Sequence, residues 1–166
     1  MNDSLKTVIQ AHPFFYGMKP EHLNIIIGCA TEATFTPEQI LFHESEPANK
    51  FYLIQSGRIA LEAHEPANGT ALVQTLGVGE ALGWSWLFPP FVWHFQARAL
   101  EPTKAIVLNG AHLLVAAERD HEFGYELMKR VAQIVINRLQ ATRKQLLVHQ
   151  MQSASDNQTV KRSSKG

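Results

Sequence analysis

The sequence predicts a mainly β fold with helices at both ends, and three features of the chain indicate it. The first thirty residues carry helix signals, and from Thr31 to about Asn109 short β-type segments follow one another, separated by turn residues. From about residue 120 to about residue 151, apolar residues return at helical spacing. With 166 residues, 45% of them hydrophobic and 18% charged, the chain suits one domain with a single core.

Two short helices are expected before the strands. Pro13 interrupts the first of them, and Pro20 has the fixed φ angle that suits the opening turn of a helix. The second helix is predicted over residues 22–30, with one apolar face. That face consists of Leu23, Ile26 and Ile27.

The clearest strand signal is KFYLIQSGRIALEAH, residues 50–64, in which side chains alternate until Gly57 interrupts them. The glycine predicts a bend or a tight turn. Asn68-Gly69 is the strongest short hairpin signal, because a type I′ turn needs positive φ at both central positions, and ALVQTL is then the returning strand. The last strand lies in TKAIVL, before a turn at Asn109-Gly110 and the start of helical sequence.

The closing helix, about residues 120–151, is apolar along two lines. One line repeats at spacings of 4, 3, 4, 3 and 4, as in helices that pair with a second helix, and we expect it to form a homodimer. This dimer seam consists of Met128, Ala132, Val135, Leu139, Thr142 and Leu146. The second line, Leu127, Val131 and Ile134, is predicted to pack on the strands. The same residues would also suit a single helix that lies along its own strands.

Composition excludes several classes of protein. The fifteen basic and fifteen acidic residues give a formal net charge of zero, so no overall charge attracts nucleic acid or an anionic membrane. Cys29 is the single cysteine, which excludes an intrachain disulfide and a thiolate metal site. We expect a cytoplasmic protein without a signal peptide or membrane insertion, because no apolar run is long enough. Residues 152–166 are polar and are expected to form a disordered tail.

The order of FHESEPANKFYLIQSGRIAL, LGVGEALG and QARALEP before a long closing helix resembles the cyclic nucleotide-binding domain of the catabolite-activator (Crp/Fnr) type. The resemblance covers about residues 5–148. Its most specific parts are FYLIQSGRIAL and the run Gly79-Glu80-x-x-Gly83, which resembles the opening of that family's phosphate cassette. The resemblance implies a double-stranded β-helix, or jelly-roll barrel, of about eight strands. The domain would occupy residues 1–151 and act in ligand sensing and signal transduction.

The resemblance also implies a site made of a strand followed by one helical turn. In such a cassette, glycines let the backbone approach the ligand, and free N–H groups hold the cyclic phosphate. A glutamate just after the second glycine binds the ribose hydroxyl in that family, and a downstream arginine binds the phosphate. The corresponding residues here form a degenerate cassette: Gly79, Glu80, Leu82, Gly83, Trp84, Ser85, Trp86, Trp93 and His94.

This cassette departs from the family at both charged positions. Trp84 stands at the glutamate position and cannot accept a hydrogen bond, and the arginine position holds Trp93, or His94 if the loop gap moves by one residue. Arg98 lies on the following strand and is not assigned to the phosphate. Charge-assisted hydrogen bonds contribute roughly 1.5 to 3 kcal/mol each, so losing two would weaken nucleotide binding by about 10²- to 10⁴-fold.

The cluster of aromatic residues in this stretch has three interpretations. The rings could fill the pocket that a ligand would otherwise occupy, since each aromatic side chain can bury roughly 150 to 250 Å². They could form a reshaped pocket or patch for an apolar or aromatic molecule. A nucleotide could also bind in an unusual mode, with His94 supplying a proton-dependent positive charge.

No catalytic residues, cofactor or metal site are predicted. The eight histidines are scattered without a His-x-His pair, and Cys29 has no basic neighbour in sequence. We therefore predict a non-enzymatic regulatory or sensor module, with cyclic AMP binding lost or altered and without a DNA-binding domain. The alternatives are a protein-interaction module with a plugged pocket that acts through its closing helix, and a true cyclic nucleotide binder with an unusual mode.

Overall fold

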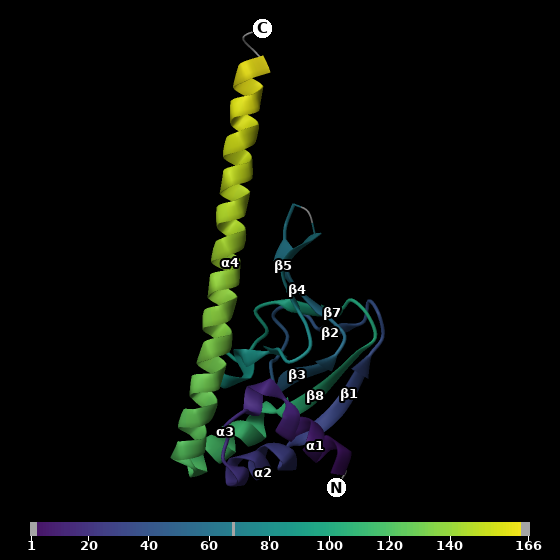
Figure 1. Cartoon of the computed structure of the whole chain (residues 1–166), viewed down its shortest axis with the longest axis vertical. Helices are drawn as coiled ribbons and strands as arrows, with labels where there is room; N and C mark the ends of the chain where they lie inside the picture. Colours follow the sequence, from purple (N-terminus) through teal and green to yellow (C-terminus); the bar gives the residue numbers. More distant parts are fainter. Residues whose placement is uncertain (1–2, 68, 164–166) are drawn as a thin grey trace.

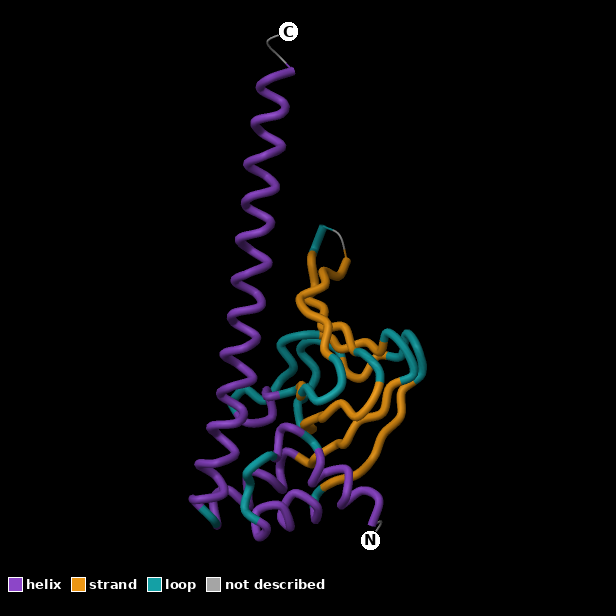
Figure 2. The backbone as a smooth tube through the Cα atoms, viewed as in Figure 1, coloured by secondary structure: helices purple, strands orange, loops and turns teal. Residues whose placement is uncertain are grey.

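The computed structural model describes residues 3–67 and 69–163, and its β strands form two sheets with helices at both ends (Figure 1, Figure 2). The N-terminal helices are α1 (Asp3–Ala11), the 3₁₀ turn η1 (Pro13–Phe15) and α2 (Pro20–Gly28). The first strands are β1 (Ala30–Phe35), β2 (Ile40–Phe42), β3 (Lys50–Ser56), β4 (Ile59–Glu65) and β5 (Gly69–Leu76). The remaining elements are β6 (Ala81–Leu82), η2 (Trp84–Leu87), β7 (Gln96–Ala99), β8 (Thr103–Asn109), α3 (Gly110–Arg119) and α4 (His121–Ser163).

The mainly β fold with flanking helices is confirmed, with the eight strands arranged in two antiparallel sheets. One sheet has the order β1-β8-β3-β6 and the other has the order β2-β7-β4-β5. Each sheet thus joins strands that are distant in sequence, because β8 pairs with both β1 and β3, and β7 pairs with both β2 and β4. We call the two sheets together the β-body.

Two clusters of buried side chains hold the chain together. One cluster lies between the sheets and includes Phe42, Ile54 and Trp93. The other joins the N-terminal helices, α3 and the start of α4 to the first sheet, and it includes Phe51 and Trp86. The β-body therefore carries separate apolar contacts on its inside and on its helix-covered side.

The predicted turns agree with the structure where it describes them. Gly57 separates β3 from β4 with φ of +88°, and a Cβ atom there would lie 2.6 Å from the carbonyl oxygen of Pro102. Strands β4 and β5 pair antiparallel from Ile59↔Leu76 to Glu65↔Gly69, as expected of a hairpin, although Asn68 itself lies outside the described residues. Asn109 caps α3, since its side-chain oxygen accepts a hydrogen bond from the N–H of His112.

The N-terminal helix α2 differs from the prediction at both ends. It begins at Pro20 rather than at residue 22 and ends at Gly28 rather than at residue 30. Pro20 occupies the first turn, where its missing N–H costs nothing. Ala30 leaves the helix because it already pairs with Leu108 at the start of β1.

The closing helix α4 starts as predicted and packs on the β-body through its second apolar line. Asp120 accepts a hydrogen bond from the N–H of Phe123, which satisfies one donor of the first turn. Leu127 and Val131 are fully buried and Ile134 packs against the same cluster, so this part of the prediction is confirmed.

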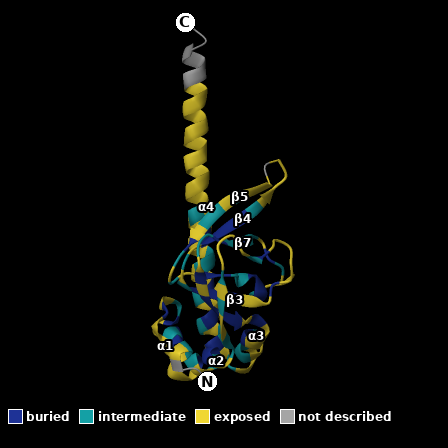
Figure 3. Cartoon of the chain, turned by 90° about the vertical axis from the view of Figure 1, so that its right-hand side faces the viewer, coloured by how far each residue is buried: buried dark blue, intermediate teal, exposed yellow. Residues whose placement is uncertain are grey.

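The end of the closing helix was predicted wrongly. The helix continues to Ser163, so residues 152–163, expected to be disordered, are helical and extend far beyond the β-body (Figure 1, Figure 3). The polar composition suggested disorder, but neither glycine nor proline interrupts residues 125–163, and the helical pattern needs no core to continue. None of the helices in the described ranges is long and apolar enough to cross a membrane.

Candidate functional site

The backbone of the cassette has the shape that its glycines predict. Gly79 and Gly83 have φ of +83° and +89°, the left-handed region that glycine enters without strain. Between them, β6 pairs with β3, and Gly83 then caps the short turn η2. A Cβ atom on Gly83 would lie 2.9 Å from the ring of Trp93, so the glycine is also needed for packing.

Glu80 and Leu82 serve the local structure of the cassette. The carboxylate of Glu80 accepts a hydrogen bond of 2.7 Å from the N–H of Gly77, and the backbone N–H of Glu80 donates one to the carbonyl oxygen of Gly77. These two bonds close the turn between β5 and β6. Leu82 is fully buried between the sheets.

Trp84, at the position of the family's glutamate, covers His94. The two rings are stacked, with centroids 5.1 Å apart and planes at 20°. A hydrogen bond of 3.0 Å joins Ser85 Oγ to Nδ1 of the same histidine. The hydroxyl of Ser85, which is buried, and one ring nitrogen of His94 are thus already hydrogen-bonded to each other.

Trp93, one of the two residues expected at the position of the family's arginine, fills the space between the sheets. Its ring stacks on Phe42 with centroids 3.8 Å apart and planes at 15°. The ring of Tyr52 lies next to both, with its centroid 6.3 Å from that of Trp93 and 5.8 Å from that of Phe42. Only 4% of Trp93 is exposed. The cavity that remains at the cassette has a volume of about 10 Å³ and is lined by Phe42, Gly83, Ser85, Trp93, His94 and Arg138. Such a volume holds a single water molecule at most.

Trp86 does not belong with the other two tryptophans. The sequence grouped all three in one cassette, but Trp86 is buried in the helix-side cluster, where its ring lies 5.7 Å from Phe51. A Cβ atom on Gly110 would lie 2.8 Å from Trp86, so α3 covers this indole closely. The interpretation of the stretch as one aromatic pocket is therefore wrong for Trp86, which is a core residue.

Arg138 on α4 is the residue at this site that sequence reasoning missed. Only 8% of it is exposed, although it lies in the basic half of the helix. Burial lowers the pKa of its guanidinium to about 10, and the charge of Glu80 opposes that shift. The signal was present in the sequence, because Arg138 continues the buried line of Leu127, Val131 and Ile134 by one more spacing of four.

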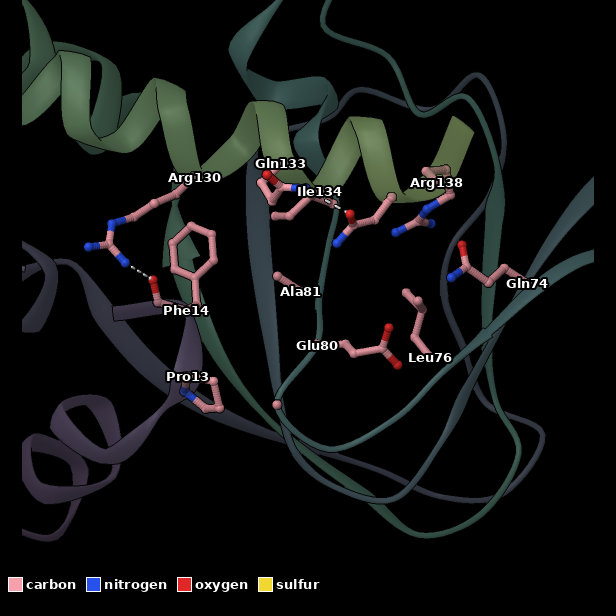
Figure 4. A pocket seen from close by; sticks show the side chains of 12 residues that line it. Pro13, Phe14, Gln74, Leu76, Glu80, Ala81, Arg130, Gln133, Ile134 and Arg138 are labelled. Carbon is pink, nitrogen blue, oxygen red and sulfur yellow. Dashed lines mark hydrogen bonds between the residues drawn. The ribbon is translucent and has the colours of Figure 1, made fainter. Parts of the chain in front are cut away.

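A groove of about 340 Å³ lies on the other side of Arg138, between α4 and the β5–β6 segment (Figure 4). Successive turns of α4 form one wall of the groove, and η1 closes one end. Gln74, Leu76 and Glu80 lie opposite the helix (Figure 4). Arg138 lines both this groove and the small cavity at the cassette. The groove is therefore the larger space next to the cassette.

Arg98 has a structural role in the second sheet. Its guanidinium pairs with Glu62 and donates hydrogen bonds to Glu38 at 2.8 and 3.0 Å. The hydrogen bonds from Arg98 lower the pKa of the Glu62 carboxyl, which is almost fully buried. This pair links β7 to β4 within the second sheet.

The predicted dimer seam is largely exposed along the single chain. Met128 is 42% exposed, Leu139 68% and Leu146 58%, whereas Val135 is partly covered. Ala132 and Thr142 are exposed as well. The helix therefore uses its second apolar line, and not this seam, to pack on its own β-body.

Across the part of the chain that the structure describes, three or more histidine, cysteine or acidic side chains nowhere gather closely enough to hold a metal ion. Burial raises the pKa of the Cys29 thiol to about 11, which disfavours the thiolate.

Two antiparallel sheets, a cassette bounded by glycines and a long closing helix together define the architecture of a regulatory domain. The chain belongs to the cyclic nucleotide-binding domain family, because the sequence model with that description matches residues 32–120. The resemblance seen in the sequence is thereby confirmed.

Solved structures with the same fold include chains that are matched over most of their length. A protein from Geobacter metallireducens GS-15, described as cyclic nucleotide-binding, is 27% identical, with 82% of this chain and 96% of that chain covered and a TM-score of 0.71. A cyclic nucleotide-binding domain from Methylobacillus flagellatus is 17% identical, with coverage of 89% and 85% and a TM-score of 0.78. The catabolite activator protein of Thermus thermophilus is 20% identical over 83% of this chain and 63% of that one, with a TM-score of 0.66. No curated protein matches the sequence.

Proposed function

We propose that this protein is a non-enzymatic sensor module in which the family's cassette no longer binds cyclic AMP in the usual way. The observation that carries the proposal is the stack of Trp93 on Phe42, which leaves about 10 Å³ at the cassette. Pockets for small molecules commonly measure about 300 to 1,000 Å³. A cyclic nucleotide could enter only if Trp84 or Trp93 moved, and neither indole replaces the lost carboxylate or guanidinium.

The strand orders 1-8-3-6 and 2-7-4-5 support a jelly-roll arrangement of the β-body. In this arrangement the ligand-facing residues of the cassette would be those around Gly83, Ser85 and His94. Because α4 packs on the cassette through Arg138 and on the helix-side cluster through Leu127, a change in the cassette would reach the helix directly. The helix would then pass the signal on.

A thermal unfolding experiment with cyclic AMP, cyclic GMP and cyclic di-GMP tests this proposal. A ligand that binds only the folded protein must raise its melting temperature. We expect no rise with any of the three nucleotides for the natural sequence. A rise that grows with nucleotide concentration would contradict the proposal.

A matched variant tests the physical reason. Trp84→Glu with Trp93→Arg restores both charged groups of the family and removes two indoles from the cassette. We expect this folded double variant to gain stability from cyclic AMP, through two charge-assisted hydrogen bonds. If it folds and still shows no response, the tryptophans are not what prevents binding.

A protein-interaction module acting through α4 is the second candidate function, and the exposed seam supports it. Met128, Leu139 and Leu146 lie on that seam and are exposed along the same face of the helix, and apolar side chains gathered on one face mark an interaction surface. We propose a homodimer as the first assembly of this kind. Its test is the oligomeric state of the Leu139→Glu variant, given in the Discussion.

A further inference from the structure

The groove under α4 contains a buried positive charge without a partner. Within the described ranges, no residue accepts a hydrogen bond from the guanidinium of Arg138 or forms an ion pair with it, and its Nε atom is fully enclosed. A buried charge normally persists only when it is paired, because leaving water is costly. Arg138 is thus poised for an anionic group that the protein itself does not supply.

Gln74 provides a second polar group at the same place. Its side-chain oxygen is also buried and lacks a hydrogen-bond partner among the described residues. Figure 4 shows the side chains of Gln74 and Arg138 at the same end of the groove, one from β5 and one from α4. Buried polar atoms are almost always satisfied in folded proteins, so two orphaned groups at one end of a groove indicate a ligand site.

Arg130 and Glu80, the other charged residues that line the groove, form no ion pair with Arg138. Arg130 donates to the carbonyl oxygens of Phe14 and Tyr16 and pairs with Glu126. Glu80 lies opposite Arg138, but it accepts its hydrogen bond from Gly77 and makes no ion pair with the arginine. Its negative charge weakens the attraction of the site for an anion without occupying it.

The remaining wall of the groove is partly apolar. Phe14, Leu76, Ala81 and Ile134 form its apolar part, while the side-chain amide of Gln133 donates a hydrogen bond of 2.8 Å to that of Asn137. The groove volume of about 340 Å³ suits a small organic molecule. We propose that this groove binds a small organic acid, a carboxylate or a phosphate ester on an apolar body, with Arg138 holding the acid group and Gln74 a neighbouring hydroxyl or amine. The acid would tie α4 to the β5–β6 segment. The inference goes beyond the proposed function, since it holds whether or not the cassette binds a nucleotide.

Nuclear magnetic resonance titration of the full chain tests the site. Benzoate and phenyl phosphate serve as anionic probes, and benzyl alcohol serves as the neutral probe of similar shape. We expect at least one anionic probe to shift the backbone signals of Gln74, Ala81 and Ile134 in a saturable manner, and benzyl alcohol to bind about tenfold more weakly or worse. Benzoate alone would identify a carboxylate site, and phenyl phosphate alone a phosphate site. If neither anion binds, or the neutral probe binds equally well, the proposal is overturned.

Three variants locate the charge. Arg138→Met should lower the affinity for the anion about tenfold or more. Arg143→Met removes an exposed arginine of the same helix and should leave the affinity unchanged. Glu80→Gln should tighten binding about two- to fivefold, because it removes the opposing charge. Equal weakening by the two arginine variants would overturn the proposal. Cyclic AMP serves as a reference ligand for the cassette. Signal shifts with cyclic AMP that are confined to Ser85 and His94 would show binding at the cassette and not in the groove.

Thermal unfolding without any probe provides an independent check. Arg138→Met should raise the melting temperature, since it removes an unpaired buried charge and keeps the aliphatic length, and Arg143→Met should not. The inference would be overturned if Arg138→Met and Glu80→Gln each lowered the melting temperature by a similar amount and the double variant lowered it no further. Such coupling would mean that Glu80 is the partner of Arg138.

Discussion

Trp93→Ala tests whether the cassette is filled by the protein itself. Trp93 is 4% exposed, and an aromatic side chain of this kind buries roughly 150 to 250 Å². At about 25 cal/mol per Å², the lost burial corresponds to about 4 to 6 kcal/mol of unfolding free energy, near the range of about 3 to 5 kcal/mol usual for such truncations. We therefore expect a loss of about 4 kcal/mol, most of a small domain's stability.

Urea unfolding followed by circular dichroism measures this loss, with the slope against urea expected to stay unchanged. Trp84→Ala is the matched control, because Trp84 is only partly buried and should cost about 1 to 2 kcal/mol. The new cavity should accept indole, so saturating indole should raise the melting temperature of Trp93→Ala and leave the natural protein unaffected. A loss below about 1 kcal/mol without any effect of indole would refute the filled cassette.

Three further predictions follow from the structure. Gly57→Ala should cost about 1 to 3 kcal/mol in urea unfolding, because φ is +88° and the new Cβ would lie 2.6 Å from backbone; equal stability would contradict the turn. The pKa of Glu62 is held below its ordinary 4.5 by Arg98, so the pair stabilises the fold above that pH, and this stability is lost as pH falls through the folded-state pKa. Melting temperatures between pH 7 and pH 3 measure this loss. Arg98→Met should cost about 1 to 3 kcal/mol at neutral pH while flattening the acid dependence, because Glu62 keeps its hydrogen bond from Gln96. If α4 forms the proposed homodimer, Leu139→Glu should sediment as a monomer at unchanged helicity, and a natural protein that sediments as a monomer would contradict the proposed dimer.

Much of the β-body could be predicted because its signals are local. The alternation in residues 50–64 and the glycine at position 57 specify two strands and the turn between them without information from distant residues. The buried line of α4 was equally predictable, because Leu127 and Val131 repeat at helical spacing. The pairing of β8 with β1 and β3 joins residues that are distant in sequence, and no local signal predicts it.

The parts that could not be predicted depend on which neighbour each side chain meets. Trp84 and Trp86 lie two residues apart on one short turn, so they point to different places, and only the position of Gly110 against Trp86 assigns that ring to the helix-side cluster. Arg138 continues a buried line, but its charge favoured a solvated face in the sequence. Residues 152–163 contain only two apolar residues, Ala154 and Val160, and a helix without an apolar face leaves no periodic signal.

Isothermal titration of the natural protein with cyclic AMP measures the central point most directly. With two indoles where the family has its carboxylate and its guanidinium, the titration should give no saturable heat up to about 1 mM nucleotide, which corresponds to less than about 4 kcal/mol of binding free energy. One nucleotide bound per chain at micromolar concentration, with unchanged affinity in His94→Ala, would mean that the cassette opens and recognises its family's ligand after all.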